Sequence, residues 1–156
     1  MNGAVESVAA LRAEPVADAQ ASKAKILLVD DEPKSLFALQ ELLSTLGQNL
    51  MVAQSGEEAL KLALKHDFAV ILLDVRMPGM DGFETAAAIR SIERFRRVPI
   101  IFLSAHGDRR ADGRDAYCEF ILKPVEPAVI RPRVAAHLQR EPKTAASRAP
   151  GDRSAS

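Results

Sequence analysis

Acidic, hydroxyl and basic side chains follow four of the five apolar runs in this 156-residue chain, each at the point where a run ends. Asp30 and Asp31 follow the first run, Asp74 the third, Ser104 the fourth and Lys123 the fifth. Open parallel sheets bind ligands in the crevice outside the carboxyl ends of their strands. If the apolar runs are neighbouring parallel strands, we expect these five side chains to converge on one crevice.

The charges of these groups indicate a chemistry. Three carboxylates packed together raise one another's pKa unless a cation neutralises them. Oxygen ligands without His or Cys suit a hard cation, and Mg²⁺ is the common choice for phosphoryl chemistry. Asp74 can then act as a nucleophile toward phosphorus and form an aspartyl phosphate. The phosphoryl oxygens would be stabilised by Mg²⁺, the Lys123 ammonium and the Ser104 hydroxyl.

Apolar runs alternate with helical patterns along the middle of the chain. The expected strands are 26–29, 50–53, 69–73, 98–103 and 120–122. The expected helices run from Pro33 to a cap at Gly47, from a capping box of Ser55 and Glu58 through Leu64, from Asp81 or Gly82 through Arg90, and from about Pro127 to Gln139. This alternation predicts an α/β fold with a flavodoxin-like, doubly wound, five-stranded parallel sheet in the order 2-1-3-4-5.

Composition favours one domain with a proper core. Apolar residues make up 47% of the chain and charged residues 27%, and acids and bases balance at 21 each, so charge gives no general reason to expect nucleic-acid or membrane binding. Cys118 is the only cysteine, which excludes an intramolecular disulfide and a Cys-based zinc site and fits a cytoplasmic location. There is no signal-peptide pattern. We expect a flexible tail over 1–24, one domain over 25–140 and a disordered tail over 141–156.

Four short motifs occur in the order and nearly the spacing of a known family. They are LVDDE (28–32), LLDVRMPGMDG (72–82), LSA (103–105) and FILKP (120–124). Through these motifs, residues 25–139 resemble the receiver domain of the two-component response-regulator family. The resemblance is to the single-domain, chemotaxis-regulator-like members, with no attached effector.

The resemblance implies a role for each site residue. Asp74 would be the phosphoacceptor. Asp31 and Asp74 would bind Mg²⁺ directly and Asp30 through water, with the backbone carbonyl of Arg76 as a further ligand. Lys123 would contact the phosphoryl group. The phosphodonor would be a phosphohistidine on a histidine kinase or a histidine phosphotransfer protein, and the chain would catalyse only its own phosphorylation and dephosphorylation.

The resemblance also implies a switch. Ser104 would swing toward the phosphoaspartate and Phe120 would move inward with it, while the Lys123–Pro124 bond would be cis. Arg76 and His106 each lie two residues past a site residue, where side chains in this family border the phosphoryl group and influence its lifetime. Our hypothesis is that Arg76 screens the phosphoryl group from water; the alternative is that both are solvated loop residues.

Two features depart from the family pattern. The segment between Ser104 and Lys123 is three or four residues shorter than usual, and its two glycines and dense charge leave no apolar stripe. We therefore expect the fourth helix of the family to be short, frayed or absent. Pro132 falls inside the last expected helix, where we expect it to kink or interrupt that helix. Both features lie on the face that carries the signal in many receivers.

Other interpretations remain at this stage. Alone, Asp30 and Asp31 are more often a helix cap and Asp74 is often a turn residue. The leading prediction is a phosphorylated switch that signals by protein contact or onward phosphotransfer to a downstream protein. A second is a receiver-like docking module that phosphate does not switch. A third is a Mg²⁺-dependent phosphohydrolase, but Arg76 stands where such enzymes usually place a second acid.

Overall fold

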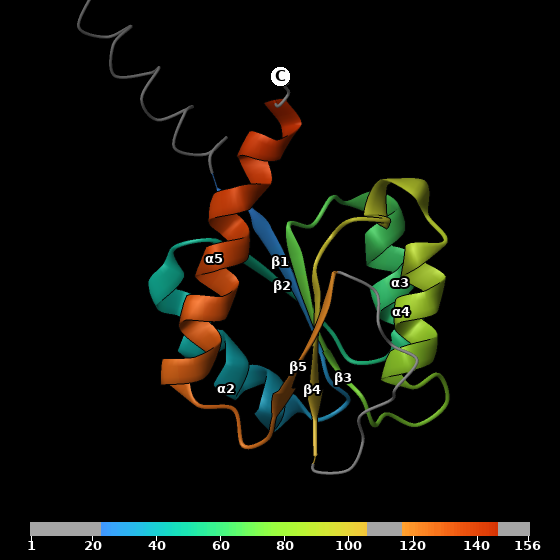
Figure 1. The fold of residues 1–156 in the computed structure, drawn as a ribbon. Helices are drawn as coiled ribbons and strands as arrows, with labels where there is room; N and C mark the ends of the chain where they lie inside the picture. The colour runs from blue at the N-terminus through green and yellow to red at the C-terminus, as the bar shows by residue number, and fades with distance from the viewer. Residues whose placement is uncertain (1–22, 106–116, 147–156) are drawn as a thin grey trace, which may run out of the picture.

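A computed structural model describes residues 23–105 and 117–146 of the chain (Figure 1). Five parallel strands form one sheet in the order β2-β1-β3-β4-β5. The strands are β1 (Lys25–Val29), β2 (Asn49–Ala53), β3 (Val70–Asp74), β4 (Ile100–Ser104) and β5 (Cys118–Leu122). The predicted fold class and strand order are confirmed.

Helices cover both faces of the sheet. The α-helices are α2 (Pro33–Leu43), α3 (Gly56–Lys65), α4 (Gly82–Arg90) and α5 (Pro127–Ala146), and two short 3₁₀ helices are η1 (Ser44–Leu46) and η2 (Glu93–Phe95). Figure 1 shows α2 and α5 against one face and α3 and α4 against the other. Leu36, Leu39 and Leu43 are the buried stripe of α2, and the strand side chains that alternate toward α2 and α5 complete that half of the core. The central strands β1, β3 and β4 are buried on both faces, as in other parallel sheets, whereas the edge strands β2 and β5 are only partly buried.

Local sequence explains where α3 and α4 begin. The Ser55 side chain accepts a hydrogen bond from the Glu58 backbone N–H, but the Glu58 side chain accepts from Gln54 rather than from Ser55. The expected reciprocal box is therefore only half formed at α3. The complete box lies at α4, where Asp81 accepts from the Glu84 backbone and Glu84 accepts from the Asp81 backbone.

The last helix is longer than expected, and Pro132 does not interrupt it. Helix α5 runs through Pro132 without interruption and continues to Ala146, past the expected end at Gln139. A proline removes one backbone donor, which leaves the carbonyl four residues earlier without a partner. That carbonyl belongs to Ala128, and both Ala128 and Pro132 are exposed, so water can satisfy it.

The expected fourth helix falls mostly within residues 106–116 and lies outside the described part of the chain. Among the helices that are described, none combines the length and the apolar character needed to cross a membrane.

Candidate functional site

The carboxyl ends of β1, β3, β4 and β5 bring the predicted site residues together. Val29 pairs with Leu73, Asp74 with Leu103, and Ser104 with Leu122, so Asp30, Asp74, Ser104 and Lys123 follow one another across the sheet edge. The first three are almost completely buried, at 2%, 3% and 2% exposure. The predicted convergence is therefore present.

Three carboxylates lie close together in the site, two of them buried and that of Asp31 exposed. One oxygen each of Asp30, Asp31 and Asp74 lies within 4.8 Å of the others. The Asp30 carboxylate also accepts a hydrogen bond of 3.0 Å from the Glu32 backbone N–H, which fixes its position at the start of the loop. Helix α2 begins at Pro33 with Glu32 as its N-cap and no side-chain cap, so Asp30 and Asp31 are not the cap of this helix.

Lys123 faces this cluster from the end of β5. Its Nζ lies 2.5 Å from Oδ1 of Asp74, and its backbone N–H donates to the Ser104 carbonyl at 2.9 Å. The Lys123–Pro124 peptide bond is cis, as expected. The Asp74 side chain is 5% exposed and the Lys123 side chain 37%, so the ammonium lies between the buried carboxylate and solvent.

The charges at this site do not balance. Burial raises the pKa of Asp74, against the hydrogen bond from Lys123, and the charge of Asp30 adds to the increase. Burial also raises the pKa of Asp30, against the hydrogen bond from Glu32. Burial opposes the charged form of Lys123, but the hydrogen bond and charge of Asp74 outweigh it and raise its pKa. The single positive charge of Lys123 therefore lies beside three carboxylates. The negative charge that remains uncompensated favours the binding of a cation.

The loop after Asp74 is closed onto the sheet. The Val75 backbone N–H donates to the Leu103 carbonyl at 3.1 Å, and the Gly82 N–H donates back to the Val75 carbonyl at 2.9 Å. Arg76 lies in this loop and is exposed. His106 lies outside the described residues.

Phe120 is part of an aromatic cluster that the sequence did not predict. Its ring stacks on Phe102 of β4 at 5.1 Å between centroids, and Phe83 of α4 lies 4.9 Å from Phe102 and 6.2 Å from Phe120. Phe102 and Phe120 are register partners on neighbouring strands. The sequence does contain a signal for this pairing. Phe102 lies two residues before the strand end at Ser104, and Phe120 lies two residues before the strand end at Leu122, so the two rings are level on neighbouring strands.

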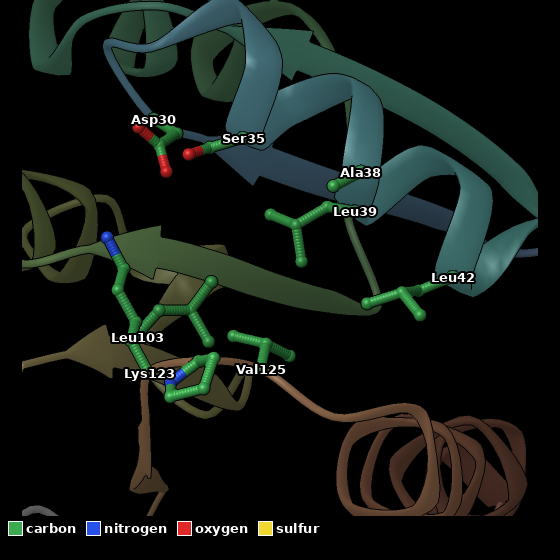
Figure 2. A pocket seen from close by; sticks show the side chains of 9 residues that line it. Asp30, Ser35, Ala38, Leu39, Leu42, Leu103, Lys123 and Val125 are labelled. Atoms are coloured by element: carbon green, nitrogen blue, oxygen red, sulfur yellow. The ribbon is translucent and has the colours of Figure 1, made fainter.

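A groove of about 280 Å³ adjoins the site on the α2 side. Figure 2 shows side chains of α2 along one wall and those of Leu103, Lys123 and Val125 along the other. The full lining is Asp30, Ser35, Ala38, Leu39, Leu42, Leu103, Lys123, Pro124 and Val125. The groove is mostly apolar, but Asp30 and Lys123 belong to both the groove and the acidic site.

Comparison with known proteins identifies the family. Residues 26–135 match the sequence profile of the response regulator receiver domain. The chain belongs to this family. It is 35% identical over 123 residues to the transcriptional regulatory protein SrrA of Staphylococcus aureus, with 77% of this chain and 50% of SrrA covered. It is 32% identical over 120 residues to the sensor histidine kinase GacS of Pseudomonas protegens, with 73% and 13% covered. The aligned receiver region therefore spans half or less of these curated relatives.

Solved receiver domains have the same fold. A two-component transcriptional regulator of Clostridium phytofermentans superimposes with a TM-score of 0.71 at 30% identity, covering 80% of this chain and 100% of that one. The response regulator TrrA of Thermotoga maritima, solved in complex with Mg²⁺-BeF, gives a TM-score of 0.66 at 32% identity, covering 73% and 98%. The chain is thus a receiver domain of two-component systems, a family of signalling switches.

Proposed function

We propose that this receiver domain accepts a phosphoryl group on Asp74 from a phosphohistidine of a histidine kinase or histidine phosphotransfer protein. The observation that carries the proposal is the 2.5 Å contact between Lys123 Nζ and Asp74 Oδ1 beside two further carboxylates. In this arrangement a buried carboxylate oxygen can act as the nucleophile. The Lys123 ammonium beside it can then stabilise the negative charge that develops on a phosphoryl group.

Within this chain, the transfer changes the covalent structure of Asp74 alone. An Asp74 carboxylate oxygen attacks phosphorus, the P–N bond of the phosphohistidine breaks, and its electron pair goes to the imidazole nitrogen. Lys123 moves its hydrogen bond from the carboxylate to a phosphoryl oxygen, where negative charge is spread in the transition state. The Ser104 hydroxyl, at the end of the neighbouring strand, donates to the phosphorylated group.

The donor set of the acidic cluster fits Mg²⁺. Its ligand atoms are carboxylate oxygens, they lie within 4.8 Å of one another, and their negative charge exceeds that of the single ammonium. Asp30, Asp31, Asp74 and the backbone carbonyl of Arg76 would hold the cation. When bound, Mg²⁺ supplies positive charge to the phosphoryl oxygens.

We further propose that the phosphodonor protein covers the groove beside the site. A donor must bring its phosphohistidine to Asp74, and the groove lined by Asp30 and Lys123 opens directly beside that carboxylate. Its apolar walls, formed by Ala38 and Leu42 among others, can pack against an apolar surface of the donor. The output is protein contact or onward phosphotransfer, with Ser104 and Phe120 as the switch.

Phosphorylation by acetyl phosphate with Mg²⁺ tests the proposal. Intact-mass spectrometry should show one phosphoryl adduct on the full chain, and Asp74→Asn should abolish it. Asp81→Asn is the matched control, because it removes a carboxylate from the same loop while asparagine caps a helix equally well. No adduct on the wild type would favour a docking module without phosphate switching, an adduct retained by Asp74→Asn would exclude Asp74 as the acceptor, and multiple turnover of a phosphate ester would indicate a phosphohydrolase.

A further inference from the structure

We propose that Gly82 is a positioning residue for the phosphoacceptor, an inference that rests on the proposed function of Asp74. Gly82 is the first residue of α4 and is buried. A Cβ at this position would lie 2.8 Å from the Val75 Cα and 3.0 Å from the Asp74 carbonyl carbon, with the Asp74 carbonyl oxygen closer still. The missing side chain therefore lets the first turn of α4 rest directly on the peptide group that follows Asp74.

A larger residue cannot be accommodated by a rotamer change. The atoms that a Cβ would meet are backbone atoms of Asp74 and Val75, and real Cβ atoms essentially never come closer than 3.0 Å to such neighbours. Either the Asp74 peptide or the start of α4 must move. Since the Gly82 N–H also closes the loop by its 2.9 Å bond to the Val75 carbonyl, both movements deform the same loop.

The first turn of α4 resists such a movement. Asp81 and Glu84 form the reciprocal capping box, and the Thr85 hydroxyl donates to the Asp81 carbonyl at 2.7 Å. Thr85 is fully buried. The displacement is therefore directed into the loop, which carries the Asp74 carboxylate at one end and the Arg76 carbonyl, a proposed cation ligand, next to it.

Helix α3 provides a matched comparison for a merely structural glycine. Gly56 is also the first residue of its helix, which is capped by Ser55 as α4 is capped by Asp81. A Cβ at Gly56 would collide with Thr85 Oγ1 and lie 2.8 Å from Met80 Sδ, which are side-chain atoms. Gly79 lies in the phosphoacceptor loop with φ of 75°, but a Cβ there meets nothing within 4 Å. Gly56→Ala tests pressure on two side chains, Met80 in the loop and Thr85 in α4, without a clash with the backbone after Asp74. Gly79→Ala tests backbone strain in the loop.

The test measures Mg²⁺ binding by calorimetry and thermal unfolding in EDTA for the full-length wild type, Gly82→Ala, Gly56→Ala and Gly79→Ala. All three variants should unfold at lower temperature than the wild type. Gly82→Ala should also bind Mg²⁺ more weakly, by about 10- to 100-fold, the usual range for a residue that positions a ligand. This loss should clearly exceed that of Gly56→Ala, whose Cβ meets side chains, and that of Gly79→Ala, whose Cβ meets nothing within 4 Å. Its rate of phosphorylation by acetyl phosphate should fall at Mg²⁺ concentrations that restore occupancy, because Asp74 itself is displaced.

Each result decides between the inference and its alternatives. Wild-type affinity in folded Gly82→Ala overturns the inference, as does an equal loss in all three variants, which would indicate general destabilisation. A wild type that neither binds Mg²⁺ nor accepts phosphate overturns the proposed function instead.

A milder pair of variants covers the case in which Gly82→Ala does not fold. Asp81→Ala loosens the first turn of α4 and should weaken Mg²⁺ binding, whereas Ser55→Ala, which removes the equivalent cap of α3, should not. Asp81→Asn is the control for the lost charge, since it keeps the cap. Equal Mg²⁺ affinity for Asp81→Ala and Asp81→Asn overturns the inference.

Discussion

Replacing Asp30 by asparagine separates the destabilising charge of the acidic cluster from its use in cation binding. Burial is the main cause that raises the pKa of Asp30, so its carboxylate destabilises the folded protein when no cation is present. Asparagine keeps the Oδ1 acceptor for the Glu32 N–H and removes the charge. We expect Asp30→Asn to stabilise the protein in EDTA and to raise its Tm, by about 0.5 to 2 kcal/mol, the usual range for a single stabilising substitution.

Magnesium should reverse this order. A ligand that binds only the folded state stabilises it by about 2.7 kcal/mol at a concentration 100 times its Kd. The wild type should gain this stabilisation if the cluster binds Mg²⁺, whereas Asp30→Asn lacks one carboxylate of the cluster and should gain clearly less. The variant should therefore be the more stable protein in EDTA and the less stable one in saturating Mg²⁺.

The advantage of the variant in EDTA should also depend on pH. Because the pKa of Asp30 is raised on folding, the folded wild type binds more protons than the unfolded chain near this pKa. Its disadvantage is absent below the ordinary aspartate pKa of about 3.9 and grows as the pH rises through the folded-state value. The stabilisation by Asp30→Asn should be present at neutral pH and vanish in acid.

Thermal unfolding followed by circular dichroism, with EDTA and with Mg²⁺, measures all three effects. Asp67→Asn is the control, because the Asp67 side chain is 87% exposed and lies in the ion pair with Arg94 rather than in the cluster. We expect it to change stability little and to leave the gain from Mg²⁺ intact. Destabilisation by Asp30→Asn in EDTA at neutral pH, or an undiminished gain from Mg²⁺, would refute the reasoning.

Two further variants test the groove and the loop. Ala38→Arg places a long charged side chain in the groove and should lower kcat/KM for a phosphohistidine donor protein at least about tenfold, while phosphorylation by acetyl phosphate stays unchanged. Glu41→Arg, on an exposed position of α2 outside the groove, should leave both reactions near wild type, and an equal effect of the two variants would exclude the groove as the docking surface. Arg76→Ala should shorten the lifetime of phosphorylated Asp74, measured by mass spectrometry after removal of the donor, because water then reaches the phosphoryl group more easily. An unchanged or longer lifetime would show that Arg76 does not screen it.

Much of the site could be predicted because its residues are tied to strand ends. Apolar runs locate the strands, and the polar residue after each run marks the carboxyl end, so the convergence of Asp30, Asp74, Ser104 and Lys123 follows from the strand order alone. The strand limits were less accurate. β3 and β4 extend to Asp74 and Ser104 because backbone pairing continues past the last apolar residue. β4 begins only at Ile100 because Pro99 has no N–H to donate.

Contacts that depend on the exact path of the chain could not be predicted in this way. The choice of Gln54 rather than Ser55 as the partner of the Glu58 side chain depends on the path of the chain into α3. The collision of a Cβ at Gly82 with the Asp74 carbonyl depends on how closely α4 approaches β3. A glycine before a helix has many explanations in a sequence, and only the packed structure distinguishes a turn requirement from a close approach.

If the proposed phosphorylation of Asp74 holds, the geometry of the site predicts how the domain would distinguish between donors. The Asp74 side chain is almost fully buried and contacts Lys123, whose side chain is partly exposed. An anionic phosphoryl group would therefore meet Lys123 before the carboxylate, whatever molecule carries it, so Lys123 would not discriminate between donors. The groove between α2 and Val125 offers a mostly apolar surface that a small phosphate ester cannot fill. Selection of the donor protein should thus depend on the groove, whereas phosphoryl transfer should depend on the residues at the strand ends. Asp30 and Lys123 belong to both regions. Substitutions of other groove residues should therefore change donor selection without changing the transfer itself.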